Sequence, residues 1–184
     1  MNRWGILVVA LLVLSGCAVP VAGTPVAAPV TSGAGADAEL VRWMNNFCGV
    51  ANYLVASGGV STGEPATDPA AAKKQLSEAL GRVVDVLNVA VHDLGELTPA
   101  PAPAGDTAVQ VTVEPLTKAR DKLASAKSTV DGATGLTMDV YSTVLQNMTE
   151  AVGVMNEGVE KMTNVSLPPE FVAAGKEAAN CKAK

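Results

Sequence analysis

Aromatic residues and histidine are scarce in this chain of 184 residues. It contains two Trp, two Tyr, two Phe and a single His. A core must therefore be built from Leu, Val, Met and Ala, whose side chains bury less area apiece than aromatic rings. A Ser-His-Asp hydrolase is also disfavoured, because no Gly-x-Ser-x-Gly segment supplies a nucleophile for the one histidine.

Basic residues are few and form no cluster. The chain has 13 Lys and Arg residues against 18 Asp and Glu residues, a net charge of −5. Binding to nucleic acid depends on neutralising phosphates, and binding to anionic lipid depends on polybasic segments. We therefore expect no nucleic-acid partner and no electrostatic attachment to a membrane. Glycine-rich phosphate-binding loops are absent as well, so no nucleotide cofactor is predicted.

A long apolar run is also missing. The run over residues 4–14 has 11 residues, whereas a membrane-spanning helix needs about 20. Arg3 precedes this run and Ser15 and Gly16 follow it, which is the arrangement of a secretory signal. We therefore expect residues 1–16 to be a signal peptide.

The end of this segment carries a motif. Leu14-Ser15-Gly16-Cys17 resembles the lipobox of bacterial lipoproteins, a resemblance that covers residues 1–17. It implies that Cys17 receives a diacylglyceryl thioether, that the leader is cut before Cys17, and that the new amino group is acylated. Two acyl chains give stable anchoring where one does not. The alternative is an ordinary secretory signal with a chance cysteine.

Residues 17–36 read as a tether. After Cys17 they contain no charge and no aromatic residue, only small residues, valine and proline. Such a segment cannot bury enough surface to offset its ordering entropy. Its composition resembles the leaders of actinobacterial lipoproteins. The remaining residues, 37–184, are long enough for one domain with a core.

From residue 37 onward, apolar residues recur every three or four positions, the spacing of a helix face. We expect long helices over residues 37–57, 68–97, 114–130 and 136–163, and a short helix after residue 167. Residues 98–108 are predicted as a Pro/Ala hinge. Val109, Val111 and Val113 alternate as in a strand, but with no partner strand evident we interpret them as extended linker. The predicted fold is all-α: an antiparallel bundle of four long helices plus a short C-terminal helix.

The odd cysteine count fits the lipobox. Assigning Cys17 to lipid leaves Cys48 and Cys181, which can oxidise to a disulfide outside the cytosol. Both lie on predicted inward faces, and the loop between them has 132 residues. In the chain-entropy model, closing such a loop stabilises the fold by about 4–5 kcal/mol. The alternative is two separate buried thiols. Without a Cys-x-x-Cys motif, we expect a structural bridge rather than a redox pair.

The fourth helix has a methionine repeat. Its predicted inward face comprises Leu136, Val140, Val144, Met148, Val152, Met155, Val159 and Met162. Met148, Met155 and Met162 recur every seven residues, and thioethers are soft ligands that suit Cu(I) or, together with a histidine such as His92, haem iron. A bundle core filled with adaptable side chains has the same pattern. We therefore expect a core role and keep metal or haem binding as the weaker hypothesis.

No catalytic constellation is predicted, and no cofactor is required. We expect an exported lipoprotein, held at the cell membrane by lipid on Cys17, whose helical body is a non-enzymatic binding or interaction module with an envelope protein as partner. The alternative is a small-molecule carrier, for lipid or for haem or a metal, with an apolar cavity in the bundle. An internal apolar pocket of a few hundred Å³ would favour the carrier.

Overall fold

The computed structural model describes residues 37–57 and 66–182. These ranges contain five α-helices, one 3-10 turn and no strand: α1 (Ala38–Ser57), α2 (Pro69–Gly95), α3 (Pro103–Gly132), α4 (Met138–Thr163), α5 (Pro169–Glu177) and η1 (Ala179–Cys181). The predicted all-α fold is confirmed. The predicted signal peptide and tether (1–16 and 17–36), with Cys17, lie outside the described residues.

Local sequence explains where the helices begin. Asp68 precedes Pro69, and its Oδ1 accepts a hydrogen bond from the backbone N–H of Ala71 at 2.8 Å. The Asp37 carboxylate accepts from the N–H of Glu39 at 2.9 Å, at the start of α1. Such caps satisfy backbone donors that have no partner within the helix. Both boundaries were predicted from the sequence.

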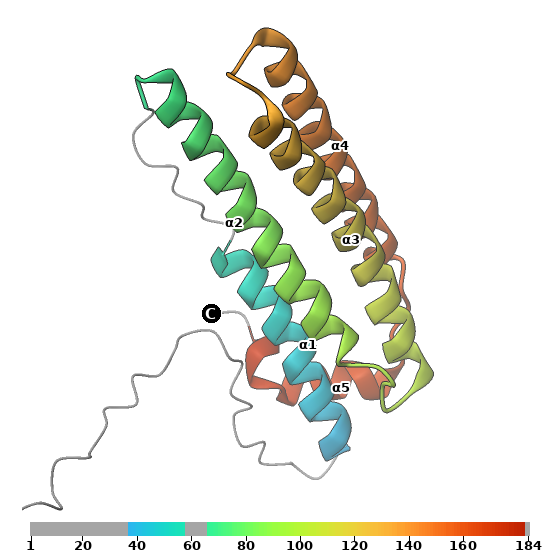
Figure 1. Cartoon of the computed structure of the whole chain (residues 1–184). Coiled ribbons are helices and arrows are strands. Elements are labelled where there is room, and N and C mark those ends of the chain that lie inside the picture. The colour runs from blue at the N-terminus through green and yellow to red at the C-terminus, as the bar shows by residue number, and fades with distance from the viewer. Residues whose placement is uncertain (1–36, 58–65, 183–184) are drawn as a thin grey trace, which may run out of the picture.

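The three longest helices form an antiparallel layer with α3 in the middle (Figure 1). α3 packs against α2 on one side and α4 on the other, while the backbones of α2 and α4 do not come together. The shorter α1 lies beside the lower part of α2, and α5 crosses the same end of the body (Figure 1). α1 therefore covers the layer of three long helices only near one end, where it packs on α2.

The scarce aromatic residues gather at that end. The ring of Trp43 stacks on Phe47, with centroids 5.3 Å apart, and meets Phe171 of α5 edge-on at 5.7 Å. The Trp43 indole N–H donates to the carbonyl of Leu97 at 2.8 Å, which satisfies the polar group of a buried ring. This cluster joins α1, α5 and the end of α2.

The expectation for residues 98–113 is wrong in part. α3 begins at Pro103, so the segment predicted as extended linker is helical, with Val109 buried. Pro115 resembles a helix start in the sequence, yet it lies inside α3 with its ring buried. The helix loses one backbone hydrogen bond there, but the flat ring fits directly against Gly158 of α4. Tertiary packing thus overrides the local signal.

The predicted inward face of the fourth helix is also wrong in part. Val144 is buried as expected, and the side that meets α3 continues through Ala151 and Gly158. Several residues predicted to be inward are exposed instead, by 38 to 64%: Met148, Val152, Met155 and Val159. No other helix of the described ranges covers them, since α4 has backbone contacts with α3 alone and none with α1. Near the C-terminal end of α1 itself, Val55 is exposed rather than inward.

Candidate functional site

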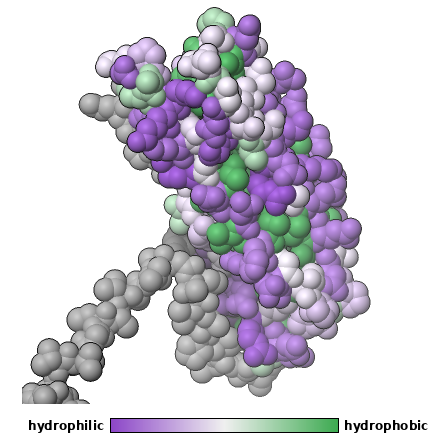
Figure 2. Space-filling model, in the orientation of Figure 1, coloured by the Kyte–Doolittle hydropathy of each residue, from purple (hydrophilic) through white to green (hydrophobic). Residues whose placement is uncertain are grey.

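Apolar surface is unevenly distributed over the body. Hydrophilic residues predominate on the face shown in Figure 2, where apolar residues form small patches. Of the eleven large hydrophobic side chains exposed in the described part of the chain, seven lie on α4. We call these seven the α4 stripe: Met138, Tyr141, Leu145, Met148, Val152, Met155 and Val159. One helix therefore concentrates the exposed apolar surface.

The α4 stripe has the spacing of a coiled-coil seam. Its members follow one another by three and four residues in strict alternation, which places them in one line along the helix. On one side the line borders the residues packed on α3. On the other side it borders Ser142, Thr149 and Asn156, which are exposed and uncharged. The stripe and its free border thus carry no charge.

The acidic residues of α4 lie away from the stripe. Glu150 pairs with Lys122 of α3 and accepts a hydrogen bond from Gln146 at 3.0 Å. These contacts, chiefly the one with Lys122, hold the pKa of Glu150 below its usual value. Glu157 and Glu160 are exposed to solvent. Their arrangement gives no pair of carboxylates facing one another across a cleft.

An apolar groove of about 200 Å³ lies at the C-terminal end of the stripe. Three helices line it: α1 through Leu54, α3 through Val111, Thr112, Pro115 and Leu116, and α4 through Met155, Gly158, Val159 and Met162. Thr112 is the one polar residue in this lining. Gly158 and Pro115 are in close contact in this lining, since a Cβ on Gly158 would lie 2.5 Å from the Pro115 ring.

The structure does not bring the suggested metal ligands together. Met148 and Met155 are exposed members of the stripe, and Met162 is half-buried in the groove. His92 lies exposed on α2, with its Nδ1 3.2 Å from Asp93, and α2 does not approach α4. The described ranges also contain no group of three or more His, Cys, Asp and Glu side chains that could hold a metal ion.

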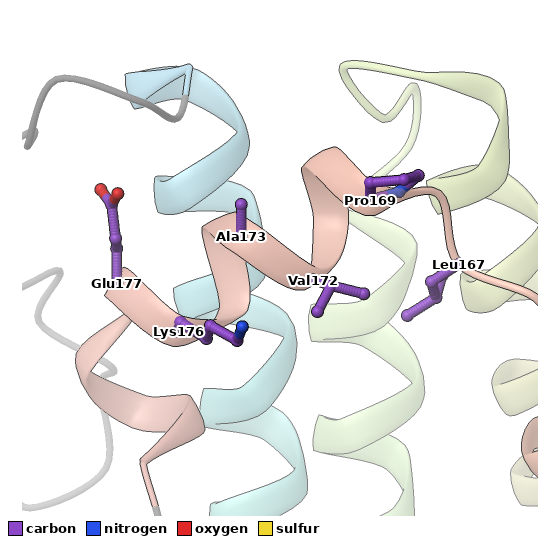
Figure 3. A pocket seen from close by; sticks show the side chains of 6 residues that line it. All are labelled: Leu167, Pro169, Val172, Ala173, Lys176 and Glu177. Carbon is purple, nitrogen blue, oxygen red and sulfur yellow. The ribbon is translucent and has the colours of Figure 1, made fainter.

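A second hollow, of about 570 Å³, lies on the surface of α5 (Figure 3). Its lining residues come from α5 and the segment just before it: Leu167, Pro169, Val172, Ala173, Lys176 and Glu177. Leu167 and Val172 lie near one another, while the Glu177 carboxylate points away from them (Figure 3). This hollow is not the cavity between bundle helices that a carrier was expected to have.

The cysteine pair lies where α1 meets η1. Cys48 of α1 and Cys181 of η1 have their sulfur atoms 2.12 Å apart, at disulfide-bonding distance, and their Cα atoms 5.1 Å apart. Beside them, the buried Asn45 side chain accepts from the backbone N–H of Asn180 at 2.9 Å, and the Asn180 amide donates to the carbonyl of Asn45 at 3.1 Å. We call these four residues the C-terminal clasp. Sequence reasoning found its cysteines and missed its asparagines, whose one signal is their nearness to the cysteines.

At the opposite end of the body, α2 holds the end of α3. The Asp131 carboxylate accepts from Lys127 and from Ser77, each at 2.5 Å, and both contacts lower the pKa of Asp131, that of Lys127 most. The Lys73 ammonium donates to the carbonyls of Asp131 and Ala133, at 3.1 and 2.6 Å. A cation at a helix C-terminus donates hydrogen bonds to the free carbonyls and interacts favourably with the helix dipole. These contacts are structural.

No helix among residues 37–57 and 66–182 is long and apolar enough to cross a membrane. Comparison of the chain with protein-family models, with curated proteins and with solved structures found no match.

Proposed function

We propose that the chain is an exported lipoprotein, anchored through Cys17, and that its helical body is a non-enzymatic binding module. The α4 stripe carries the second part of this proposal, because its seven side chains are exposed in one uncharged line. The largest apolar patch on a soluble domain covers about 300–600 Å² and is often a functional site. The module thus binds through a helix face.

The first part of the proposal rests on the resemblance of residues 14–17 to a lipobox. The distance between the sulfur atoms of Cys48 and Cys181 supports it, because a structural disulfide persists in oxidising compartments and is rare in the cytosol. Removal of residues 1–16 would leave 12 basic and 18 acidic residues, so charge does not explain membrane attachment. Acyl chains would supply it.

A carrier of an apolar small molecule is the second candidate. The groove beside α4 favours it, since its lining is apolar apart from Thr112. Its volume of about 200 Å³ lies below the roughly 300–1,000 Å³ of ordinary ligand sites. The groove is therefore better suited to one side chain of a partner than to a lipid or haem.

Anchoring is tested with the full-length chain in its host. Mass spectrometry of the purified protein should show Cys17 as the first residue, carrying acyl chains. The variant Cys17→Ser should move from the membrane fraction to the soluble fraction, and Arg42→Ser, at an exposed position, should stay at the membrane. An unmodified Cys17, or an uncut leader, would contradict the proposal.

The binding role is tested by photocrosslinking in intact cells. A photoreactive residue at position 152 lies in the α4 stripe, and one at position 89 lies on α2, where Val89 is exposed by 39%. We expect protein adducts from position 152 and none from position 89. If position 152 gives no protein adduct and the purified chain carries an extractable lipid or haem, the carrier is supported instead.

A further inference from the structure

We propose that the α4 stripe pairs with the same stripe of a second copy of this chain, in an antiparallel arrangement about a two-fold axis. The inference deepens the proposed binding function by naming a partner, and it rests on that function. It does not depend on lipid at Cys17. The structure supports it through register, charge, shape and area.

The register of the stripe is self-complementary. A two-fold axis at the level of Glu150 inverts α4 and places Tyr141 opposite Val159, Leu145 opposite Met155, and Met148 opposite Val152. At the ends, Met138 comes opposite Met162, which continues the same seven-residue repeat. Every member of the stripe thus meets an apolar residue, as an interface between identical surfaces requires.

The charge pattern permits a second copy. The chain carries a net charge of −5, so two copies repel one another unless their contact surfaces are neutral. The free border of the stripe is neutral, because Ser142, Thr149 and Asn156 occupy the positions where coiled coils carry the charges that choose a partner. A different partner that is recognised by its charges would find no opposite charge on this border.

The shape of the stripe supplies a projection and a recess. Tyr141, exposed by 42%, lies toward one end of α4, and the groove lies at the other end. Inversion of the helix brings the Tyr141 ring of one copy to Val159 and the groove of the other. An apolar cavity of about 150 Å³ can hold a benzene ring, so a groove of about 200 Å³ accommodates a phenol ring.

The area available sets the strength of the pair. Full burial of an apolar side chain of this size removes about 60–120 Å² from water, at about 25 cal/mol per Å². The seven side chains are exposed by 38 to 82%, which leaves roughly 200–450 Å² of apolar surface per copy. The pair therefore falls among weak interfaces, below about 1,200 Å² in total. Confinement to one membrane would raise its effective concentration.

The test is cysteine crosslinking between two differently tagged full-length copies in intact cells. One copy carries Tyr141→Cys and the other carries Val159→Cys. We expect disulfides between positions 141 and 159. Two residues at position 141 should not crosslink, since 18 residues of helix hold them about 27 Å apart in an antiparallel pair. The chain without added cysteines is the background control.

Two further variants separate a specific pair from chance encounters. Adding Val152→Glu to both copies should reduce the 141–159 crosslink by about tenfold, because two unpaired carboxylates would be buried near the axis. Val89→Glu, the matched change on α2, should leave the crosslink unchanged.

Other outcomes would overturn the proposal. Crosslinks mainly between identical positions would show a parallel pair. Photoadducts from position 152 with a different protein, without a 141–159 crosslink, would exclude the second copy and leave the binding module standing. Absence of both kinds of adduct would overturn the module as well.

Discussion

Asn45 shows how one residue closes this fold. Its side chain is 3% exposed, and burial of an amide costs free energy unless its hydrogen bonds are made. Its Oδ1 accepts a hydrogen bond from the backbone N–H of Asn180, and the Asn180 side chain donates to the backbone carbonyl of Asn45, so the segment at Asn180 is held to α1 beside the cysteine pair. Counting cysteines predicted the bridge from the sequence. The asparagines were missed because an asparagine beside polar neighbours has no periodic signal.

The variant Asn45→Ala should lower the free energy of unfolding by about 1–3 kcal/mol, because the part-buried Asn180 N–H would lose its acceptor. Asn52→Ala is the matched control. Its exposed side chain donates to the carbonyl of Asn180, so we expect a loss below about 1 kcal/mol. Urea unfolding of both variants measures the difference, and equal losses would contradict the role given to Asn45.

At the scale of the helices, two glycines of α4 have opposite roles. A Cβ on Gly158 would collide with the Pro115 ring, whereas a Cβ on Gly153 would meet nothing within 4 Å. Helix propensity alone treats both glycines alike, as residues that weaken the helix. Only the structure assigns close approach to Gly158 and leaves Gly153 in the open.

Gly158→Ala should therefore destabilise the fold by about 1–3 kcal/mol, since α3 and α4 must separate or shift. Gly153→Ala should stabilise it by about 0.5–1 kcal/mol, because alanine restricts the unfolded chain and favours the helix. Thermal unfolding of the two variants provides the comparison. Stabilisation by both changes would show that the helices can move apart freely.

The contact of α2 with the end of α3 should depend on pH. The Asp131 pKa is lowered in the folded state, so the stabilisation is present above the ordinary carboxyl pKa of about 4 and is lost as the pH falls through the lowered value. Asp131→Asn should be less stable than the natural chain near neutral pH, and the difference should shrink as the pH falls through the lowered pKa of Asp131. Urea midpoints across this range test it; a constant difference would contradict it.

Helix periodicity predicted elements better than it predicted burial. The apolar face of α3 is buried from Leu116 to Val130, because α3 packs between α2 and α4. The same reasoning applied to α4 was wrong at Met148 and Val152, because the pattern shows which residues share a face and not whether a neighbour covers that face. The α4 stripe could thus be found as a line in the sequence, but its exposure could not.

At the scale of the whole molecule, the C-terminal clasp joins parts that are distant in sequence. Cys48 and Cys181 are separated by 133 positions and join α1 to η1, while α1 also packs against α5. α2, α3 and α4 pack together without this link. The body thus has a layer held by helix packing and an end held by the clasp and the aromatic cluster.

Replacing both cysteines by serine should lower the free energy of unfolding by about 4–5 kcal/mol, the entropy of the released loop. The loss should be uneven. Hydrogen exchange followed by mass spectrometry should show amides of α1 and α5 exchanging faster, and those in the middle of α3 changing less. Equal acceleration in all helices would mean that the body opens as a single unit.

The place where α1 begins bears on how a pair would rest on a bilayer. Ala38 lies at the α5 end of the body (Figure 1). In an inverted pair, the two tethers would therefore join the bodies at opposite tips. The 26 residues of α4 put those tips about 40 Å apart. Residues 18–36 reach at most about 65 Å when fully stretched. A pair lying along the bilayer would keep both helix starts near the membrane, whereas an upright pair would require one tether to span about 40 Å of the roughly 65 Å that it can reach.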